Sequence, residues 1–536
     1  MIEETLINRL LENLPKTFHQ EIRDWADSQG PSPRADYWRL QAVESAVAVD
    51  TALLDVCPQD VLDMSIVLQL HDTFKSAVLD FVGLDRLLWV AASRGRGSVS
   101  SAPALKNFVA QATDHFKAML LSNTLSSIDD NVLAISLIPK QEFARRALPD
   151  IVRYRWVSRL IFDSAATITQ RHPVQFEKLN FLMIDAVDEV FNYIAASRNN
   201  LHRFDDYAKH WQRMSEDARR LCETFATSQT GQPSVSTLLS STRAERTPFV
   251  LVEGVTVPVA LQIASLALEG ALYAGARDAL TTKFGDWFEM VVEETIARVA
   301  PWATRRSGPR NIPSPDSDNA GEVDFAFGDS SQELLIGEVK GYAIPESVAS
   351  LPNALSAMAQ ASDQLRLRLE RLKQGLPLVA DDRSENSDRA IGLGVTLHSY
   401  AGALWSSEAL TVIEGIRDDM GLMPLTQTVI VIAAMESLAD LRKYLAVRAH
   451  VYAKKIIAFD EVDVLLACVN PKAIAAIDAA SDSDHVFLKM HHVEHATALA
   501  TPFPPHLGPP WLRQLFGDVR HVLSRDVTVS GRARAI

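Results

Sequence analysis

The sequence predicts a multi-domain protein in which an all-α N-terminal domain precedes an α/β domain with a mixed sheet flanked by helices. Before residue 226, several windows repeat apolar residues at three- and four-residue spacing, which is the pattern of amphipathic helices. After residue 247, short apolar runs typical of strands alternate with longer helical patterns, and this alternation predicts a sheet covered by helices. The chain has 536 residues, enough for two or more domains.

The composition is that of a globular protein without a global attraction to polyanions. The formal net charge is -14, so any contact with nucleic acid must use a local basic patch or metal ions. The three cysteines lie far apart and form neither a disulfide framework nor a zinc ligand set, which suits a reducing compartment. The N-terminus does not resemble a signal peptide, and no apolar run is long enough to cross a bilayer. We therefore expect a cytoplasmic protein with no membrane contact.

Residues 1–226 are expected to form the helical domain, which would select the substrate or a partner. The windows 61–70 and 181–191 carry the clearest helical periodicity, and Pro58 stands where a helix can start. The basic and aromatic residues of 153–159 have two interpretations. They form either a surface for nucleic acid or a partner, or an amphipathic helix with solvated arginines, and we favour the helix.

Residues 227–246 are rich in serine and threonine and are the expected linker. The stretch 248–258 then predicts a β-hairpin that turns at Glu253 and Gly254. A helix from about Val259 to Thr282 should follow it.

The stretch from Gly321 to Lys340 predicts two short strands joined by a tight turn. The first strand alternates apolar and polar residues, and a polar, glycine-led turn at 328–331 follows it. The second strand, 334–339, is nearly all apolar, as expected of a strand covered on both faces. It nevertheless ends in Glu338 and Lys340, which two-residue periodicity places on one side. Burying charges is costly unless they are paired or bind a metal, so this strand end needs a functional explanation.

An aspartate on a strand, followed by an apolar strand that ends in Glu-x-Lys, resembles the core of the PD-(D/E)xK nuclease superfamily. Asp324, Glu338 and Lys340 carry this resemblance, which covers roughly residues 247–470. One departure is Val323, which stands where the name motif has proline. The resemblance implies a restriction-endonuclease-like fold for this part of the chain.

The helix predicted from Phe284 to Ala297 resembles the first core helix of the same family. Glu289 stands where such helices carry an acidic residue, and it flanks the apolar stripe expected to pack on the sheet. Taken alone, Glu289 would be interpreted as a surface glutamate. The complete family order of helix acid, strand aspartate and Glu-x-Lys reverses that preference.

The resemblance also implies roles in metal-dependent phosphodiester hydrolysis. Asp324 and Glu338, with the backbone carbonyl of Val339, would hold Mg²⁺, for which Mn²⁺ may substitute. Glu289 would complete the metal shell or hold a second ion. Lys340 would orient the attacking water or stabilise the charge of the transition state.

A long helix is expected from about Leu355 to Gly375. In this family, the helix after the Glu-x-Lys strand often supplies a glutamine to the site, and Gln364 is the closest match. A surface glutamine is the competing interpretation, and it is the one we favour.

Four arginines near the predicted site are candidate phosphate contacts. A solvated basic loop explains them equally well. They are Arg298, Arg305, Arg306 and Arg310.

Further elements complete the predicted α/β domain. The stretches 389–399 and 428–434 are predicted buried strands, and a helix should span 437–447. In 459–466, the acids are interpreted as the first turn of a helix. The C-terminal extension, 471–536, contains histidines at metal-ligand spacing but no obvious third ligand, so a metal site there is disfavoured.

The function expected from the resemblance is a Mg²⁺-dependent endonuclease acting on nucleic acid, with DNA favoured over RNA. A role in bacterial defence against foreign DNA is known for many such stand-alone nucleases, and no residue here indicates it. One alternative is a non-catalytic PD-(D/E)xK-like module for binding or assembly. Another is a helical scaffold whose α/β part matches by coincidence. A homo-oligomer and a partner protein both stay open.

Overall fold

The computed structural model describes the greater part of the chain in two compact units. The described residues are 33–63, 65–67, 70, 84–127, 151–176, 179, 184–199, 201–227, 247–259, 272–306, 311–314, 317–330, 333–342, 351–375, 389–397, 413, 415–454, 457–458, 461, 464–465, 475, 478 and 487–488. The first unit comprises residues 1–151, 183–275 and 345–351. The second comprises 152–182, 276–344 and 352–536. The molecule is rich in helices and has two mixed sheets flanked by helices.

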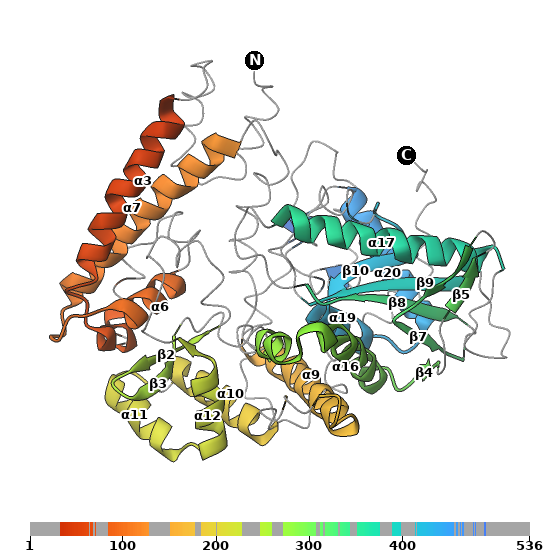
Figure 1. The fold of residues 1–536 in the computed structure, drawn as a ribbon, viewed down its shortest axis with the longest axis horizontal. Coiled ribbons are helices and arrows are strands. Elements are labelled where there is room, and N and C mark those ends of the chain that lie inside the picture. The colour runs from red at the N-terminus through yellow and green to blue at the C-terminus, as the bar shows by residue number, and fades with distance from the viewer. Residues whose placement is uncertain are drawn as a thin grey trace. The chain divides into compact units, whose positions relative to one another are not determined.

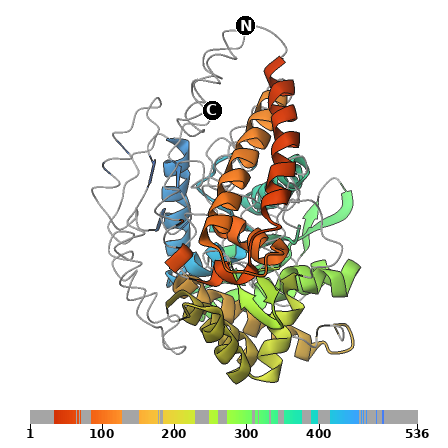
Figure 2. The same ribbon diagram turned by 90° about the vertical axis from the view of Figure 1, so that its left-hand side faces the viewer.

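Two long helices lie side by side in the first unit, α3 (Pro33–Ala52) and α7 (Ala102–Ser127), as Figures 1 and 2 both show. The short helices η2 (Pro58–Leu62) and α6 (Leu84–Arg94) lie between them in sequence. The hydroxyl of Ser45 on α3 lies 2.9 Å from Nδ1 of the buried His115 on α7. This hydrogen bond crosses an otherwise largely apolar helix pair. No helix of the described residues is both long and apolar enough to cross a membrane.

A three-stranded mixed sheet completes the first unit. Strand β2 (Phe249–Val252) pairs in parallel with β1 (Ala226–Thr227) and antiparallel with β3 (Val255–Pro258). The predicted β-hairpin is therefore confirmed. Its turn residues Glu253 and Gly254 have φ of 46° and 79°, the positive values that a two-residue hairpin turn requires. The helices that accompany this sheet are α10 (Ile184–Asn199), α11 (Phe204–Arg213) and α12 (Glu216–Thr224).

Buried aromatic side chains attach the hairpin to the helices of the first unit. The Trp89 indole N–H donates to the carbonyl of Thr247 at 2.9 Å, and the Tyr193 hydroxyl donates to the carbonyl of Thr256 at 3.1 Å.

Nearly all of helix α9 (Ile151–Arg171) belongs to the second unit. The predicted domain limits at residues 226 and 247 do not coincide with this division, and the linker 228–246 lies outside the described residues.

The second unit is built on a five-stranded mixed sheet with the order β10-β9-β8-β7-β4. Strands β8, β9 and β10 run parallel, whereas β7 is antiparallel to both β8 and β4. The sequence correctly predicted the hairpin of β7 and β8 and the buried strand β9. The strands are β4 (Thr304–Arg305), β7 (Phe325–Gly328), β8 (Leu334–Lys340), β9 (Ala390–Thr396) and β10 (Met420–Pro424).

Helices cover both faces of this sheet (Figure 1). On one face, Leu365 and Leu369 of α17 (Leu351–Lys373) pack with Leu334 and Ile336 of β8 in one buried cluster. The opposite face carries α16 (Phe284–Val299), α19 (Leu425–Ala433) and α20 (Leu438–Ala453). The preceding 3₁₀ turn is η3 (Thr281–Lys283). This arrangement is a multi-domain α/β protein, as predicted at that level of detail.

Two smaller strand pairs also occur in the second unit. Strands β5 (Asn311–Ser314) and β6 (Ser317–Glu322) form an antiparallel pair, and β11 (Ile457–Ala458) pairs in parallel with β12 (Phe487–Leu488). The sequence did not predict the first pair. It matters for the site because β6 ends two residues before Asp324.

The stretch 428–434 was wrongly predicted as a buried strand and belongs to helix α19. Every residue of α19 is buried, so its sequence has no polar face to reveal helical periodicity. A short apolar run of this kind cannot be assigned to helix or strand by its pattern alone. The strand of this region is β10, which ends immediately before α19.

The acids of 459–466 were interpreted as the first turn of a helix, and the structure assigns Glu461 to a helix. Its side chain is fully buried and pairs with Nε of Arg448 at 2.9 Å, while the hydroxyl of Tyr444 donates to its other oxygen. Arg448 also donates to the carbonyl of Leu422 on β10 at 3.2 Å. A buried ion pair of this kind ties α20 to the sheet, and removing one partner would leave an uncompensated charge.

Substituting Gly337 with alanine should destabilise the second unit. A methyl group added at Gly337 would overlap the ring of Phe325, which lies across it on the neighbouring strand. We expect the free energy of unfolding to fall by about 2 kcal/mol, since overpacking a tight core costs about 1–3 kcal/mol. Urea unfolding measures this change.

Gly285 provides the matched control, because a methyl group added there meets no atom within 4 Å. It lies in the first turn of α16, where alanine is the better helix former by up to about 1 kcal/mol. An unchanged urea midpoint for Gly337→Ala would contradict the packing described here.

Candidate active site

The pairing of β7 with β8 brings two of the predicted carboxylates together. Phe325 lies opposite Gly337, and continuing this register by one residue places Asp324 opposite Glu338. The backbone N–H of Asp324 donates to the carbonyl of Gly337 at 2.9 Å. One carboxylate oxygen of Asp324 accepts the backbone N–H of Val339 at 2.6 Å. Asp324 is thus fixed to the end of β8 through both its backbone and its side chain.

Glu338 lies at the centre of the site and is paired with two cations. Its side chain is only 3% exposed. One carboxylate oxygen lies 2.6 Å from Nζ of Lys340, two residues along the same strand and hence on the same face. The other oxygen pairs with the guanidinium of Arg368, which comes from α17. Asp324, Glu338 and Lys340 therefore converge, which a merely coincidental sequence match would not require.

The backbone carbonyl of Val339 faces the same side as Asp324. Along a strand, the carbonyls of alternate residues point in the same direction. The carbonyl of Gly337 accepts from Asp324, whereas that of Lys340 accepts from Leu397 on the side of β9. The carbonyl of Val339 must therefore point past the end of β7, into the space beside Asp324.

Glu289 of α16 is half-buried, and the charges of the same cluster affect its pKa. Burial, together with the nearby negative charges of Asp324 and Asp286, raises the pKa of Glu289 to about 7 against the opposing effect of Lys340. Burial also raises the pKa of Asp324, while the Val339 N–H, Lys340 and Arg368 lower it. Asp324 is thus close enough to disfavour the ionisation of Glu289.

The residues present fit a hard divalent cation in their donor chemistry. Carboxylate and carbonyl oxygens are the ligands that Mg²⁺ prefers, and a cation would relieve the repulsion between Asp324 and Glu289. In the arrangement shown, both oxygens of Glu338 are already paired. Accordingly, the described residues include no group of three or more His, Cys, Asp or Glu side chains that could hold a metal ion as they stand. Binding would require Glu338 to exchange a protein partner for the ion.

Gln364 lies on α17 one helical turn before Arg368, so the two share a face of that helix. Its side-chain carbonyl oxygen is buried and has no hydrogen-bond partner among the residues that the structure describes. A buried polar atom without a partner calls for an explanation such as a water or an ion. Gln364 is therefore not the freely solvated glutamine of the competing interpretation, although its role at the site stays a prediction.

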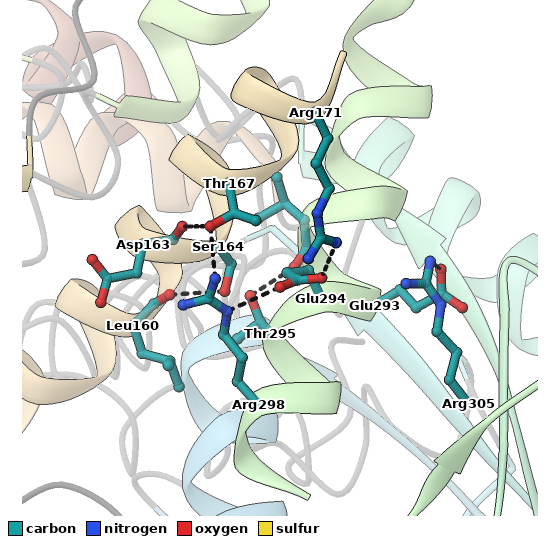
Figure 3. Close-up of polar contacts among 11 residues, drawn as sticks. Leu160, Asp163, Ser164, Thr167, Arg171, Glu293, Glu294, Thr295, Arg298 and Arg305 are labelled. Atoms are coloured by element: carbon teal, nitrogen blue, oxygen red, sulfur yellow. Dashed lines mark hydrogen bonds and ion pairs between the residues drawn. The ribbon is translucent and has the colours of Figure 1, made fainter. Parts of the chain in front are cut away.

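Arg298 and Arg305, two of the predicted phosphate contacts, form ion pairs with glutamates of α16 (Figure 3). Nε of Arg298 lies 3.1 Å from Glu294, and its guanidinium also donates to the hydroxyl of Thr167 on α9 at 2.6 Å. Arg305 pairs with the buried Glu293. These contacts hold α9 and β4 against α16 and supply a structural account of both arginines.

Arg306 is buried, and its backbone N–H donates to the carbonyl of Ala326 at 2.9 Å, which continues the pairing of β4 with β7. Arg310 lies outside the described residues. A phosphate-binding role for these four arginines stays a prediction. Arg298 and Arg305 form ion pairs with glutamates, and Arg306 is buried.

Arg368 is the charged site residue that the sequence analysis missed. Its position one turn after Gln364 was the available signal, since a helix that offers Gln364 to the site must offer Arg368 to it as well. The pattern of 365–371 hides that signal, because arginines on both faces of α17 alternate with leucines. Arg368 can be distinguished from the exposed Arg366 only through the packing of α17 on β8.

Comparison with known proteins adds no relative to this geometry. No protein-family model matches the chain, and neither the curated proteins nor the solved structures include a significant match. The likeness to PD-(D/E)xK nucleases is therefore carried by the residues described above.

The raised pKa of Glu289 predicts how stability depends on pH in the presence of EDTA. Its pKa is about 7 in the folded state and 4.5 ordinarily, so the native protein binds more protons between these values. Stability should therefore be greatest below about pH 4.5 for this group and be lost as the pH rises through about 7. For a partly exposed group, we expect a loss of about 1–2 kcal/mol after allowing for solvent screening.

Urea unfolding at about pH 5 and about pH 7.5 measures this effect. Glu289→Gln should reduce the difference between the two pH values, whereas Glu216→Gln, at an exposed helix position of the first unit, should leave it unchanged. An equally large difference in Glu289→Gln and the wild type would contradict the electrostatic environment described for Glu289.

Proposed function

We propose that the protein is a metal-dependent nuclease that hydrolyses phosphodiester bonds through a restriction-endonuclease-like second unit. The observation that supports this best is the meeting of Asp324, Glu338 and Lys340 at the end of β8, with Glu289 within electrostatic reach. A purely structural role explains Glu338 with its two cations. It does not explain why Glu289 is half-buried so close to Asp324 that the charge of Asp324 raises its pKa.

The order of elements in the second unit agrees with that proposal. An acidic helix, α16, precedes the strand pair that carries Asp324 and the Glu-x-Lys motif, and α17 follows them before a parallel strand, β9. This is the order that the resemblance to PD-(D/E)xK nucleases implies. Fold alone would not establish activity, so the argument depends on the side chains at the end of β8.

Clustered carboxylates would repel a phosphodiester, and a bound Mg²⁺ ion would invert the sign of the local charge and activate water. Asp324, Glu338 and the Val339 carbonyl are the groups that would hold it, with Glu289 at the periphery. Lys340 is positioned by its ion pair with Glu338 and supplies a donor close to the carboxylates. Its role is to orient the attacking water or to stabilise negative charge on the phosphate.

DNA is the favoured substrate, and defence of a bacterial cell against foreign DNA is a plausible setting. Both statements follow from the resemblance alone. The second candidate is a non-catalytic module that uses the same fold for binding or assembly. The closed ion pairs of Glu338 favour this alternative, since they neutralise the motif without any metal ion.

Replacing Lys340 with alanine should lower cleavage at least about 100-fold, the usual size of a lost acid–base or electrostatic contribution. The fold should persist, because Glu338 keeps Arg368 as a partner. Asp324→Asn should have a similar effect, since it removes a ligand charge. Cleavage of plasmid, linear duplex, single-stranded DNA and RNA is to be measured with Mg²⁺, with Mn²⁺ and with EDTA.

Lys443→Ala is the matched control, because Lys443 is an exposed lysine on α20 of the same unit. It should cleave like the wild type. Undiminished cleavage by Lys340→Ala would contradict the role of Lys340. A folded wild type that cleaves none of the substrates with either metal ion would support the non-catalytic alternative.

A further inference from the structure

Arg368 reaches the carboxylate cluster from α17 and, like Lys340, forms an ion pair with Glu338. Its side chain is 13% exposed and pairs with the second oxygen of Glu338. It is also within electrostatic reach of Asp324 and Glu322. The other arginine of this turn, Arg366, points to the exposed side of the helix and pairs with Asp363 at 2.8 Å.

The chain leaves room for this approach at Gly321. A methyl group added there would lie 3.5 Å from Nε of Arg368 and 3.2 Å from a terminal nitrogen of Arg371. The arginines of α17 therefore lie against the end of β6, beside the segment that leads to Asp324.

Charge balance in this space restricts what can bind. Glu338 is almost completely buried, and its two carboxylate oxygens are paired with Lys340 and Arg368. A guanidinium and a divalent cation would both use the oxygen that now faces Arg368. They cannot occupy that position together, because like charges at such short distance repel strongly.

We propose that Arg368 is a built-in counter-cation of the site, which a divalent metal ion has to displace from Glu338 in order to bind. The inference builds on the proposed function, since it concerns the regulation of the same metal site. Arg368 is a positioning residue in this scheme. It supplies a partner to the Glu338 carboxylate without metal, and it weakens the affinity for metal by competition.

The test compares Arg368→Gln with Arg366→Gln, which removes the same charge from the exposed side of the same helix. Binding of Mn²⁺ to each metal-free protein is measured by titration calorimetry. We expect Arg368→Gln to bind Mn²⁺ at least about tenfold more tightly than the wild type, because a neighbouring positive charge is gone. The Mn²⁺ affinity of Arg366→Gln should stay within about twofold of that of the wild type. The affinity of Arg368→Lys should also be close to that of the wild type.

A second measurement, of the unfolding temperature, shows whether each variant is folded. Without metal, Arg368→Gln should unfold at a lower temperature than the wild type, because Glu338 loses a partner. Mn²⁺ should raise its unfolding temperature by more than it raises that of the wild type. Asp324→Asn should abolish the tight binding in both backgrounds, which places the ion in this site.

The outcomes separate this inference from the proposed function. A folded Arg368→Gln that binds Mn²⁺ no more tightly than a wild type that binds and cleaves overturns the role of Arg368 alone. A wild type that neither binds Mn²⁺ nor cleaves overturns the proposed function, and the inference with it. Tighter binding by Arg368→Gln, lost again with Asp324→Asn, supports the competition.

Discussion

The register between β7 and β8 is the constraint on which the candidate site depends. Side chains alternate between the two faces of a strand, so a shift by one residue would move Glu338 and Lys340 to the face of α16. Close contact between Phe325 and Gly337 fixes that register sterically. The hydrogen bond from Val339 to Asp324 then extends the pairing beyond the last residue of β7. The same few residues thus determine both the packing of β7 against β8 and the positions of the candidate site residues.

Charge neutralisation explains how an acidic cluster can persist at the end of a buried strand. The two cations of Glu338 come from β8 itself and from α17, so the packing of that helix is also an electrostatic requirement. Arg368 contributes an always-charged, planar group that can satisfy a carboxylate directly. The arrangement pairs Glu338 with protein cations and retains the oxygen ligands that a metal ion would use, provided that one partner is displaced.

The sequence predicted elements best where local pattern decides them. The strand β8, the helix α16 and the helix α17 have clear periodicity, and the hairpin at Glu253 has the residues that its turn requires. Helix α19 was missed because uniform burial removes periodicity. Arg368 and the ion pairs of Arg298 and Arg305 were missed for another reason: each joins residues whose proximity depends on tertiary packing, and a single sequence carries no record of that distance.

Helix α16 carries acids in two different environments. Glu293 and Glu294 are buried, and each forms an ion pair with an arginine. Glu289, one turn earlier, has no ion pair within the described residues, and its pKa is raised to about 7. A carboxylate needed only for packing would gain from an arginine of its own, as its two neighbours do. Its proximity to Asp324 without such a partner is the condition expected of a group that shares a cation supplied from solution.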